Sequence, residues 1–206
     1  MKFCEKVKYN MRYRLIIRTI ASRLSKIGIE IIPYYLYQES LENTSMPEVC
    51  GDASEYSLEL FGTDRINILG TLVKNFNLKE STDFLESGDL CLVLKYRSEI
   101  AAFMWTSFNE IRYCSSHITI KNNEGWLSSM YTMDSFRGRN VAPFLRYKSY
   151  ELLNAMGRDV FYSYSDYFNT PAVRFKEKLN AKKLKLILFI RLFNKIRISF
   201  ILKSSE

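Results

Sequence analysis

The segment Tyr131–Ala142 reads YTMDSFRGRNVA and joins an apolar strand to a helix through a short basic loop. The first turn of a helix leaves main-chain N–H groups unpaired, and the aligned peptide dipoles add partial positive charge there. Gly138 lets the main chain curl closely around a ligand, while Arg137 and Arg139 add charge. The segment predicts a site for an anion such as a pyrophosphate. A plain strand–helix connection with solvated arginines is the alternative.

The residues before this loop predict antiparallel strands. Leu90–Tyr96 and Ile100–Phe108 are apolar runs joined by the polar turn 97–99, which is typical of a β-hairpin. A third strand is expected at Trp126–Met133, after the turn at residues 122–125. The loop therefore follows the third of three successive strands.

Helices and strands alternate after the loop. We expect, in chain order, a helix at Ala142–Met156 ended by Gly157, a strand at Val160–Ser165, a helix at Asn169–Leu179 with Pro171 in its first turn, and strands at Leu184–Phe193 and Ile196–Leu202. This order predicts a mixed α/β sheet with helices packed on it.

The N-terminal part opens with a predicted basic amphipathic helix at Tyr9–Ile27, in which isoleucine and leucine recur every three or four residues. Gly28 ends it. The helix packs on its own domain with its arginines in water, or it contacts anionic lipid or an acidic partner. We then expect a strand at Ile29–Tyr37, a loop at Gln38–Glu55, a helix at Asp64–Phe76 capped by Asp64, and a short helix at Glu80–Glu86.

Two motifs resemble the GNAT acetyltransferase superfamily. Tyr131–Ala142 is similar to its strand and pyrophosphate loop, with the pattern Arg/Gln-x-x-Gly-x-Gly/Ala. Arg137 fills the first position and Ala142 the last, but Asn140 stands where the middle glycine is usual. Asparagine tolerates left-handed main-chain angles better than most residues. Asn169–Leu179 resembles the late helix of the family, although Asn180-Ala181 replaces the usual Gly-Phe that follows it.

The resemblance covers roughly Gly88–Leu202 and implies a GNAT-like mixed, mostly antiparallel central sheet flanked by helices. It implies a GNAT-like acyl-CoA-binding core at residues 88–206, preceded by an N-terminal extension of helices and a strand at residues 1–87 that contributes to the fold. The closest likeness within the superfamily is to bacterial members that act on polysaccharides or amino sugars.

The resemblance also implies acetyl-CoA, or another acyl-CoA, as co-substrate. Its pantetheine arm would insert between the fourth and fifth strands of the core, where the fifth splays away from the fourth. The implied contacts to the cofactor come from the strand residues Tyr131, Thr132 and Met133, from the loop residues Arg137, Gly138, Arg139, Asn140, Val141 and Ala142, and from Asn169 and Phe175.

Direct acyl transfer needs a deprotonated amine, a donor to the developing oxyanion and an acid for the departing thiolate. The family often places a tyrosine acid one residue beyond Phe175, where this chain has Lys176. We expect Lys176 to be solvated, although a buried lysine with a lowered pKa could donate. Tyr164 and Tyr167 are candidate acids, with sheet packing as the alternative. Ser129, near the expected strand bulge, could orient a water.

Composition narrows the classes of partner. The net charge is +8, with about +7 over residues 1–26, +8 over residues 176–203 and −7 over the remainder of the chain. Such basic ends suit an anionic cofactor, substrate or membrane surface, and nucleic acid ranks last. Four scattered cysteines and one histidine predict no metal site. No apolar run reaches the length of a membrane span, and no signal peptide is apparent, so we expect a cytoplasmic protein.

These observations predict an acyl-CoA-dependent N-acyltransferase acting on a primary amine of a small, phosphate-bearing acceptor such as an amino sugar. The alternative is a degenerate GNAT domain that binds acyl-CoA, lipid or a protein partner without catalysis. Membrane-surface contact through the basic N-terminal helix and a homodimer stay open as assemblies.

Overall fold

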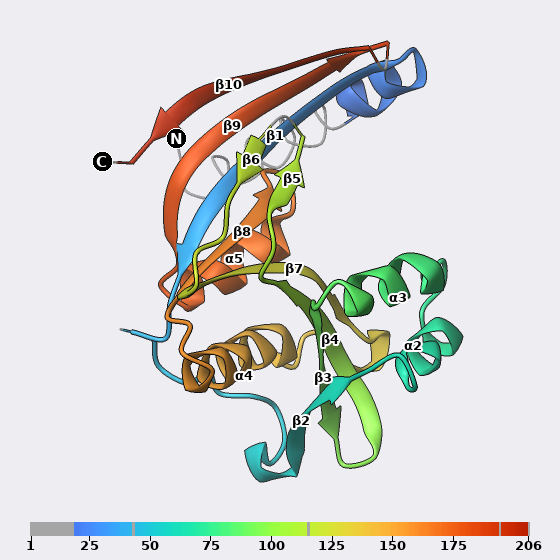
Figure 1. Cartoon of the computed structure of the whole chain (residues 1–206), viewed down its shortest axis with the longest axis vertical. Coiled ribbons are helices and arrows are strands. Elements are labelled where there is room, and N and C mark those ends of the chain that lie inside the picture. The colour runs from blue at the N-terminus through green and yellow to red at the C-terminus, as the bar shows by residue number, and fades with distance from the viewer. Residues whose placement is uncertain (1–18, 43, 115, 194, 206) are drawn as a thin grey trace, which may run out of the picture.

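The computed structural model describes residues 19–42, 44–114, 116–193 and 195–205, and its centre is a large sheet (Figure 1). In order across the sheet, the eight strands are β10 (Ile196–Ser204), β9 (Lys182–Leu192), β1 (Ile29–Glu39), β8 (Val160–Asp166), β7 (Glu124–Thr132), β4 (Glu99–Ser107), β3 (Leu90–Tyr96) and β2 (Tyr56–Phe61). The β7–β8 pair is parallel, and the other six neighbouring pairs are antiparallel. The predicted α/β fold with a mostly antiparallel sheet is confirmed.

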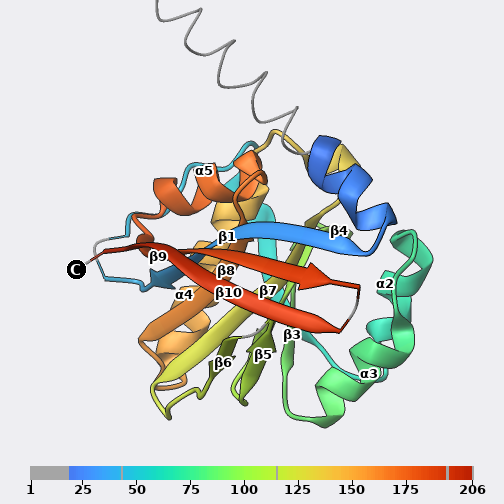
Figure 2. The same cartoon turned by 90° about the horizontal axis from the view of Figure 1, so that it is seen from above.

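Helices cover both faces of the sheet, as Figure 2 shows. They are α2 (Ile66–Leu72), α3 (Leu78–Glu86), α4 (Val141–Ala155) and α5 (Thr170–Lys178), and residues 19–26 are also helical. A second, two-stranded sheet of β5 (Ile111–Tyr113) and β6 (Ser116–Ile118) packs on the large one through Tyr113. Short 3-10 turns lie at Ala53–Glu55 and Asp134–Phe136.

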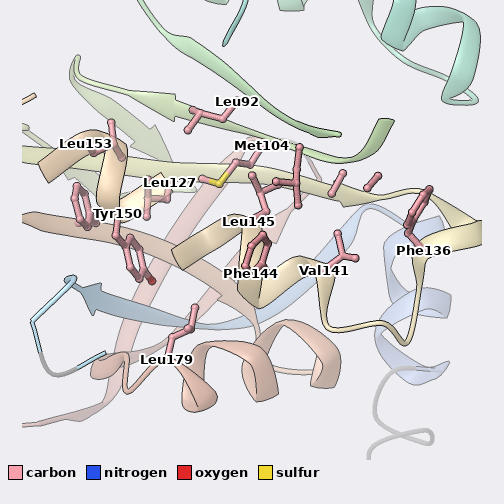
Figure 3. Close-up of a cluster of buried hydrophobic side chains, with 14 residues drawn as sticks. Leu92, Met104, Leu127, Phe136, Val141, Phe144, Leu145, Tyr150, Leu153 and Leu179 are labelled. Carbon is pink, nitrogen blue, oxygen red and sulfur yellow. The ribbon is translucent and has the colours of Figure 1, made fainter. Parts of the chain in front are cut away.

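Strand β3 shows how the sequence divides the core. Successive side chains of a strand point to opposite faces, and the whole of Cys91–Leu94 is buried. Leu92 and Leu94 pack with α4, in the cluster drawn in Figure 3. Cys91 and Val93 pack with α2 on the other face. A continuous apolar strand is therefore what a sheet covered on both faces requires.

Strands β7 and β8 pair over only a short length. Their register runs from Glu124 opposite Val160 to Trp126 opposite Tyr162, yet both strands continue beyond those residues. Strand β7 has a bulge close to the point of separation. Ser129 has a φ of 45°, and the register between β7 and β4 shifts there. The sheet therefore opens into a V between its two parallel strands.

Strand β1 is inserted between β8 and β9 and pairs with both along most of its length. Residues 29–39 of the predicted N-terminal extension are thus an integral part of the sheet. The proposed boundary between residues 87 and 88 stays a prediction.

Most predicted elements are found within a few residues of their expected bounds, but some differ. Asp64 does not cap α2, which begins at Ile66 after Arg65 and has no side-chain cap. Strand β2 was not predicted. The helix expected from Tyr9 is seen over residues 19–26, and its earlier part lies outside the described residues. In the described part of the chain, no helix is both long and apolar enough to cross a membrane.

Candidate functional site

A cleft of about 1070 Å³ opens where β7 and β8 separate, between the N-terminal ends of α4 and α5. Eleven of the predicted site residues line it: Ser129, Tyr131, Thr132, Arg137, Gly138, Asn140, Val141, Ala142, Tyr164, Asn169 and Phe175. Met133, Arg139 and Tyr167 do not. The fold therefore brings two motifs, some thirty residues apart in sequence, to one cavity.

The start of α4 presents unused main-chain donors to this cleft. No N–H group of residues 138–142 makes a hydrogen bond of normal geometry within the described part of the chain, although residues 137–140 form a turn, and no side chain caps the helix. Gly138 has a φ of +78°, and a Cβ placed on it would meet nothing within 4 Å. Free donors at the positive end of a helix dipole, beside open space, are the features of an anion site.

Asn140 takes the left-handed conformation expected of it, with φ 62° and ψ 17°. Its side chain also braces the loop. Nδ2 donates to the carbonyl oxygen of Glu48 at 2.7 Å, and Oδ1 accepts from Lys178 Nζ at 3.0 Å. The N–H of Cys50 donates to the carbonyl oxygen of Arg139 at 3.0 Å. The segment before β2 therefore supports the loop, a role that sequence reasoning missed.

The two loop arginines differ in their surroundings. Arg137 is largely exposed and pairs with Asp134 at 2.7 Å at the mouth of the cleft. The guanidinium carbon of Arg139 lies 5.3 Å from the centre of the Phe136 ring. Arg137 is therefore the better placed of the two to reach a ligand in the cleft.

Two expected cofactor contacts already have partners within the protein. The N–H of Met133 donates to the carbonyl oxygen of Ala101 at 2.9 Å, which ties it to β4. Asn169 is the N-cap of α5, where its Oδ1 accepts from the N–H of Ala172 at 3.3 Å. Tyr131 lies opposite Phe103 of β4 and has the same orientation in the ladder as Met133, so its main chain also faces β4. Main-chain pairing with a pantetheine arm is left to Thr132, which lines the cleft.

The candidate catalytic side chains are spread over different surroundings. Ser129 lies on the β7 bulge, exposed in the cleft. The Tyr164 ring lines the cleft and packs on Trp126, with ring centres 4.6 Å apart. Tyr167 packs on Tyr35, with ring centres 5.5 Å apart. For Tyr167 the structure matches sheet packing, which was the alternative to a catalytic role.

Lys176 is not solvated, contrary to expectation. It is 2% exposed and lies in the wall of the cleft. Its Nζ donates to Ser163 Oγ at 2.5 Å and to the carbonyl oxygen of Tyr164 at 2.9 Å. Burial lowers the pKa of Lys176 to about 7; the negative charge of Glu39 opposes this shift, and the positive charge of Arg146 adds to it. A buried amine thus titrates close to neutral pH.

Glu39, at the end of β1, is the buried carboxylate beneath Lys176. It accepts hydrogen bonds from Ser163 Oγ and, at 2.5 Å, from Tyr150 Oη. Arg146 Nε lies 3.6 Å and Lys176 Nζ 3.8 Å from its oxygens. Burial raises the pKa of Glu39, but the two cations and both hydrogen bonds outweigh it and leave the pKa below its ordinary value.

Sequence reasoning did not identify Glu39, Ser163 or Arg146. One signal for Arg146 was available, because it lies four residues after Ala142 and four before Tyr150, on the apolar face of the predicted helix. A charged residue at such a position is seldom buried without a partner. Which partner it meets depends on the strand order, which the sequence does not reveal.

Comparison with protein-family models finds no match, and comparison with curated proteins finds none either. Solved structures do match. An acetyltransferase of the GNAT family from Colwellia psychrerythraea superposes with a TM-score of 0.58 at 11% identity, over 81% of this chain and 59% of that one. The fold is that of the GNAT acetyltransferases.

Two GCN5-related N-acetyltransferases agree. The one from Kribbella flavida has a TM-score of 0.56 at 9% identity, over 82% of this chain and 62% of its own. The one from Sphaerobacter thermophilus has a TM-score of 0.56 at 15% identity, over 88% and 56%. The chain thus spans about three-fifths of the length of the structures that it matches. The matched share of this chain is larger than residues 88–206, so the match includes residues before Gly88. This agrees with the place of β1 inside the sheet.

Proposed function

We propose that this chain binds an acyl-CoA, with acetyl-CoA as the first candidate, and transfers the acyl group to a primary amine. The observation that carries the proposal is the set of free N–H groups at residues 138–142, which face a cleft that continues between two splayed strands. A diphosphate suits the first feature and an extended amide-containing arm suits the second, because unpaired strand edges accept an added strand.

The residues that line the cleft match the successive parts of an acyl-CoA molecule. The main chain of residues 138–142 would hold the diphosphate with help from Arg137, and the main chain of Thr132 would pair with the pantetheine arm beside the side chain of Tyr131. Phe175 would pack beside the arm. When bound, acyl-CoA supplies a thioester carbonyl that an amine can attack. The protein contributes by holding both reactants in register and by excluding water, which is worth several kcal/mol of the barrier in well-oriented systems.

For the acceptor we propose a small amine that bears phosphate, such as a nucleotide-linked or lipid-linked amino sugar. The basic character of residues 176–203 supports this choice, because an anionic acceptor is attracted to positive charge. Contact of the N-terminal helix with anionic lipid, and assembly as a homodimer, stay predictions.

The alternative of a degenerate, non-catalytic GNAT domain rested on departures from the family pattern at Asn140, Lys176 and Asn180. Asn140 and Asn180 both adopt left-handed angles, with φ 62° and 55°, so each supplies the conformation that a glycine usually provides. Lys176 lies in the cleft rather than in solvent. These observations support a site that can bind a ligand, and the non-catalytic alternative stays a second candidate.

The binding site is tested by Gly138→Leu, with Gly157→Leu as a matched control. Both glycines have a φ close to +80° and open space where a Cβ would lie, so both variants carry similar main-chain strain. Only Gly138 lies in the cleft. We expect calorimetry to show acetyl-CoA binding weakened at least about tenfold by Gly138→Leu, since a side chain there would obstruct the diphosphate, and little changed by Gly157→Leu. Equal affinities in both variants would rule out the loop.

Catalysis is separated from binding by measuring thiol release from acetyl-CoA with a panel of primary amines, including phosphate-bearing amino sugars. Release that depends on one class of amine supports transfer. Binding without release from any amine supports the non-catalytic alternative.

A further inference from the structure

Strands β9 and β10 form the outer edge of the molecule, and one of their two faces is wholly apolar (Figure 1). Residues opposite each other in an antiparallel pair lie on the same face. On this face Leu192 lies opposite Ile196, Ile190 opposite Ile198, and Leu188 opposite Phe200. The three rows continue onto β1 with Ile29, Ile31 and Pro33, in the same order. We call these nine side chains the apolar face.

The apolar face is not covered by the described part of the chain. None of its nine residues is buried, and its β10 members are between 39% and 54% exposed. The opposite face differs, because Ile187 and Phe189 of β9 are buried there with Tyr34. A sheet with one face on the core normally presents polar residues on the other. An exposed apolar patch of this kind marks an interaction site.

The apolar surface continues at the turn between β9 and β10. Phe193 is 64% exposed and has a φ of 49°, and its N–H donates to the carbonyl oxygen of Gly28 at 2.6 Å. Ile27, the neighbour of Gly28, is 61% exposed. A left-handed main chain is unfavourable for phenylalanine. The turn therefore holds two large apolar side chains in an exposed position at the end of the apolar face.

Charge indicates the kind of partner. Residues 182–205 contain seven lysines and arginines and no aspartate or glutamate. Lys195 in the turn and Lys203, which lies opposite Leu186 on the side of the apolar face, are both exposed. A second copy of the chain on this face would bring like charges together. Protein interfaces are also depleted in lysine, whereas lysines beside an apolar surface suit a bilayer with anionic headgroups.

We propose that the apolar face docks on the surface of an anionic bilayer. The apolar side chains and Phe193 enter the boundary between headgroups and acyl chains, and Lys195 and Lys203 contact lipid phosphates. Strand β10 is an end strand of the sheet. The main-chain groups along its outer edge need water or headgroups as partners, so the strands lie in the interface and do not enter the hydrocarbon.

This inference goes beyond the proposed function and does not depend on it, because no residue of the apolar face lines the cleft. The surface is also separate from the N-terminal helix for which lipid contact is predicted, because it is a face of the sheet.

Cosedimentation of the full chain with vesicles tests the docking. Vesicles of phosphatidylcholine with phosphatidylserine are compared with vesicles of phosphatidylcholine alone, at low and at high salt. We expect binding to the mixed vesicles to be stronger by at least about tenfold and to weaken as salt is added, because salt screens the lysines from the headgroups. Equal binding to the two kinds of vesicle, or binding to neither, would overturn the inference without any variant.

Two charge variants then separate the faces of β10. Ile198→Glu places a carboxylate in the middle row of the apolar face, and Ile201→Glu places the same charge on the other face, opposite Ile187. Both isoleucines are exposed, so either carboxylate can reach water in the free protein. We expect Ile198→Glu to bind the mixed vesicles at least about tenfold more weakly than Ile201→Glu. Equal losses in the two variants would show that the apolar face is not the contact.

A tryptophan reporter tests the same geometry without a change of charge. Phe200→Trp places an indole on the apolar face and Ile201→Trp places one on the other face, while Trp105 and Trp126 are buried. Vesicles with brominated acyl chains should quench the emission of Phe200→Trp more strongly than that of Ile201→Trp. The same quenching in both variants contradicts the proposed orientation.

Sedimentation velocity without vesicles tests the second copy as the occupant. A dimer that Ile198→Glu dissociates, in a chain that does not bind vesicles, would assign the apolar face to self-association and would refute the lipid contact. A monomer that binds the mixed vesicles supports it.

Discussion

Asn140 and Lys176 differ in how far the sequence around them predicts their structure. The left-handed conformation of Asn140 follows from local chemistry, because asparagine accepts positive φ more readily than most side chains. The burial of Lys176 does not. It depends on Glu39, which lies 137 positions earlier in the chain and reaches Lys176 only because β1 enters the sheet beside β8. Local sequence therefore predicted the conformation of the loop, but it did not predict the burial of Lys176 in the wall of the cleft.

The lowered pKa of Lys176 predicts that stability depends on pH. The folded chain releases the proton near pH 7, whereas an ordinary lysine holds it to about 10.5. Between these values the unfolded chain binds more protons, so the free energy of unfolding rises with pH across this window, by up to about 1.4 kcal/mol per pH unit. It falls again as the pH is lowered to 7.

Urea unfolding near pH 7 and near pH 9 measures this slope. Lys176→Met should flatten it and should be the more stable chain at the lower pH, because one of the two buried cations beside Glu39 is gone. Lys182→Met, which removes an exposed lysine of β9, should keep the slope of the unmodified chain. If Lys176→Met keeps that slope as well, Lys176 has an ordinary pKa in the folded state.

Among the elements, those with strong local patterns were predicted and those set by distant pairing were not. The hairpin of β3 and β4 and the helix α4 follow from apolar periodicity and turn residues. Strand β2 has the alternating sequence YSLELF and could have been recognised by the same rule. The place of β1 between β8 and β9 could not, because strand order is decided by packing between segments far apart in the chain.

This placement of β1 predicts the behaviour of residues 88–206 alone. Without β1, strands β8 and β9 lose the neighbour that they share, and Arg146 and Lys176 lose their buried carboxylate. We expect the fragment to lack the cooperative thermal transition of the full chain, as followed by circular dichroism. A fragment that unfolds cooperatively on its own would support the boundary at residue 88 as that of an independent domain.

At the scale of the whole molecule, the sheet brings the two short motifs together at one site. The parallel pair β7–β8 is the place where the sheet parts, and the helices that follow each of these strands start at the same cleft. The order of elements predicted a mixed sheet with helices, and the family resemblance of the two motifs implied the splayed strands. The bracing of the loop by residues 48–50 and the charges beneath the cleft required the structure.

The most direct test of the acyl-CoA site is an amide NMR titration of the ¹⁵N-labelled chain with coenzyme A. If the diphosphate is held by the start of α4, the amide resonances of Gly138, Asn140, Val141 and Ala142 should shift downfield as new hydrogen bonds form, and by more than those of Asn122 and Asn123 in an exposed turn. Coenzyme A that binds to saturation while these four resonances stay in place would contradict the account.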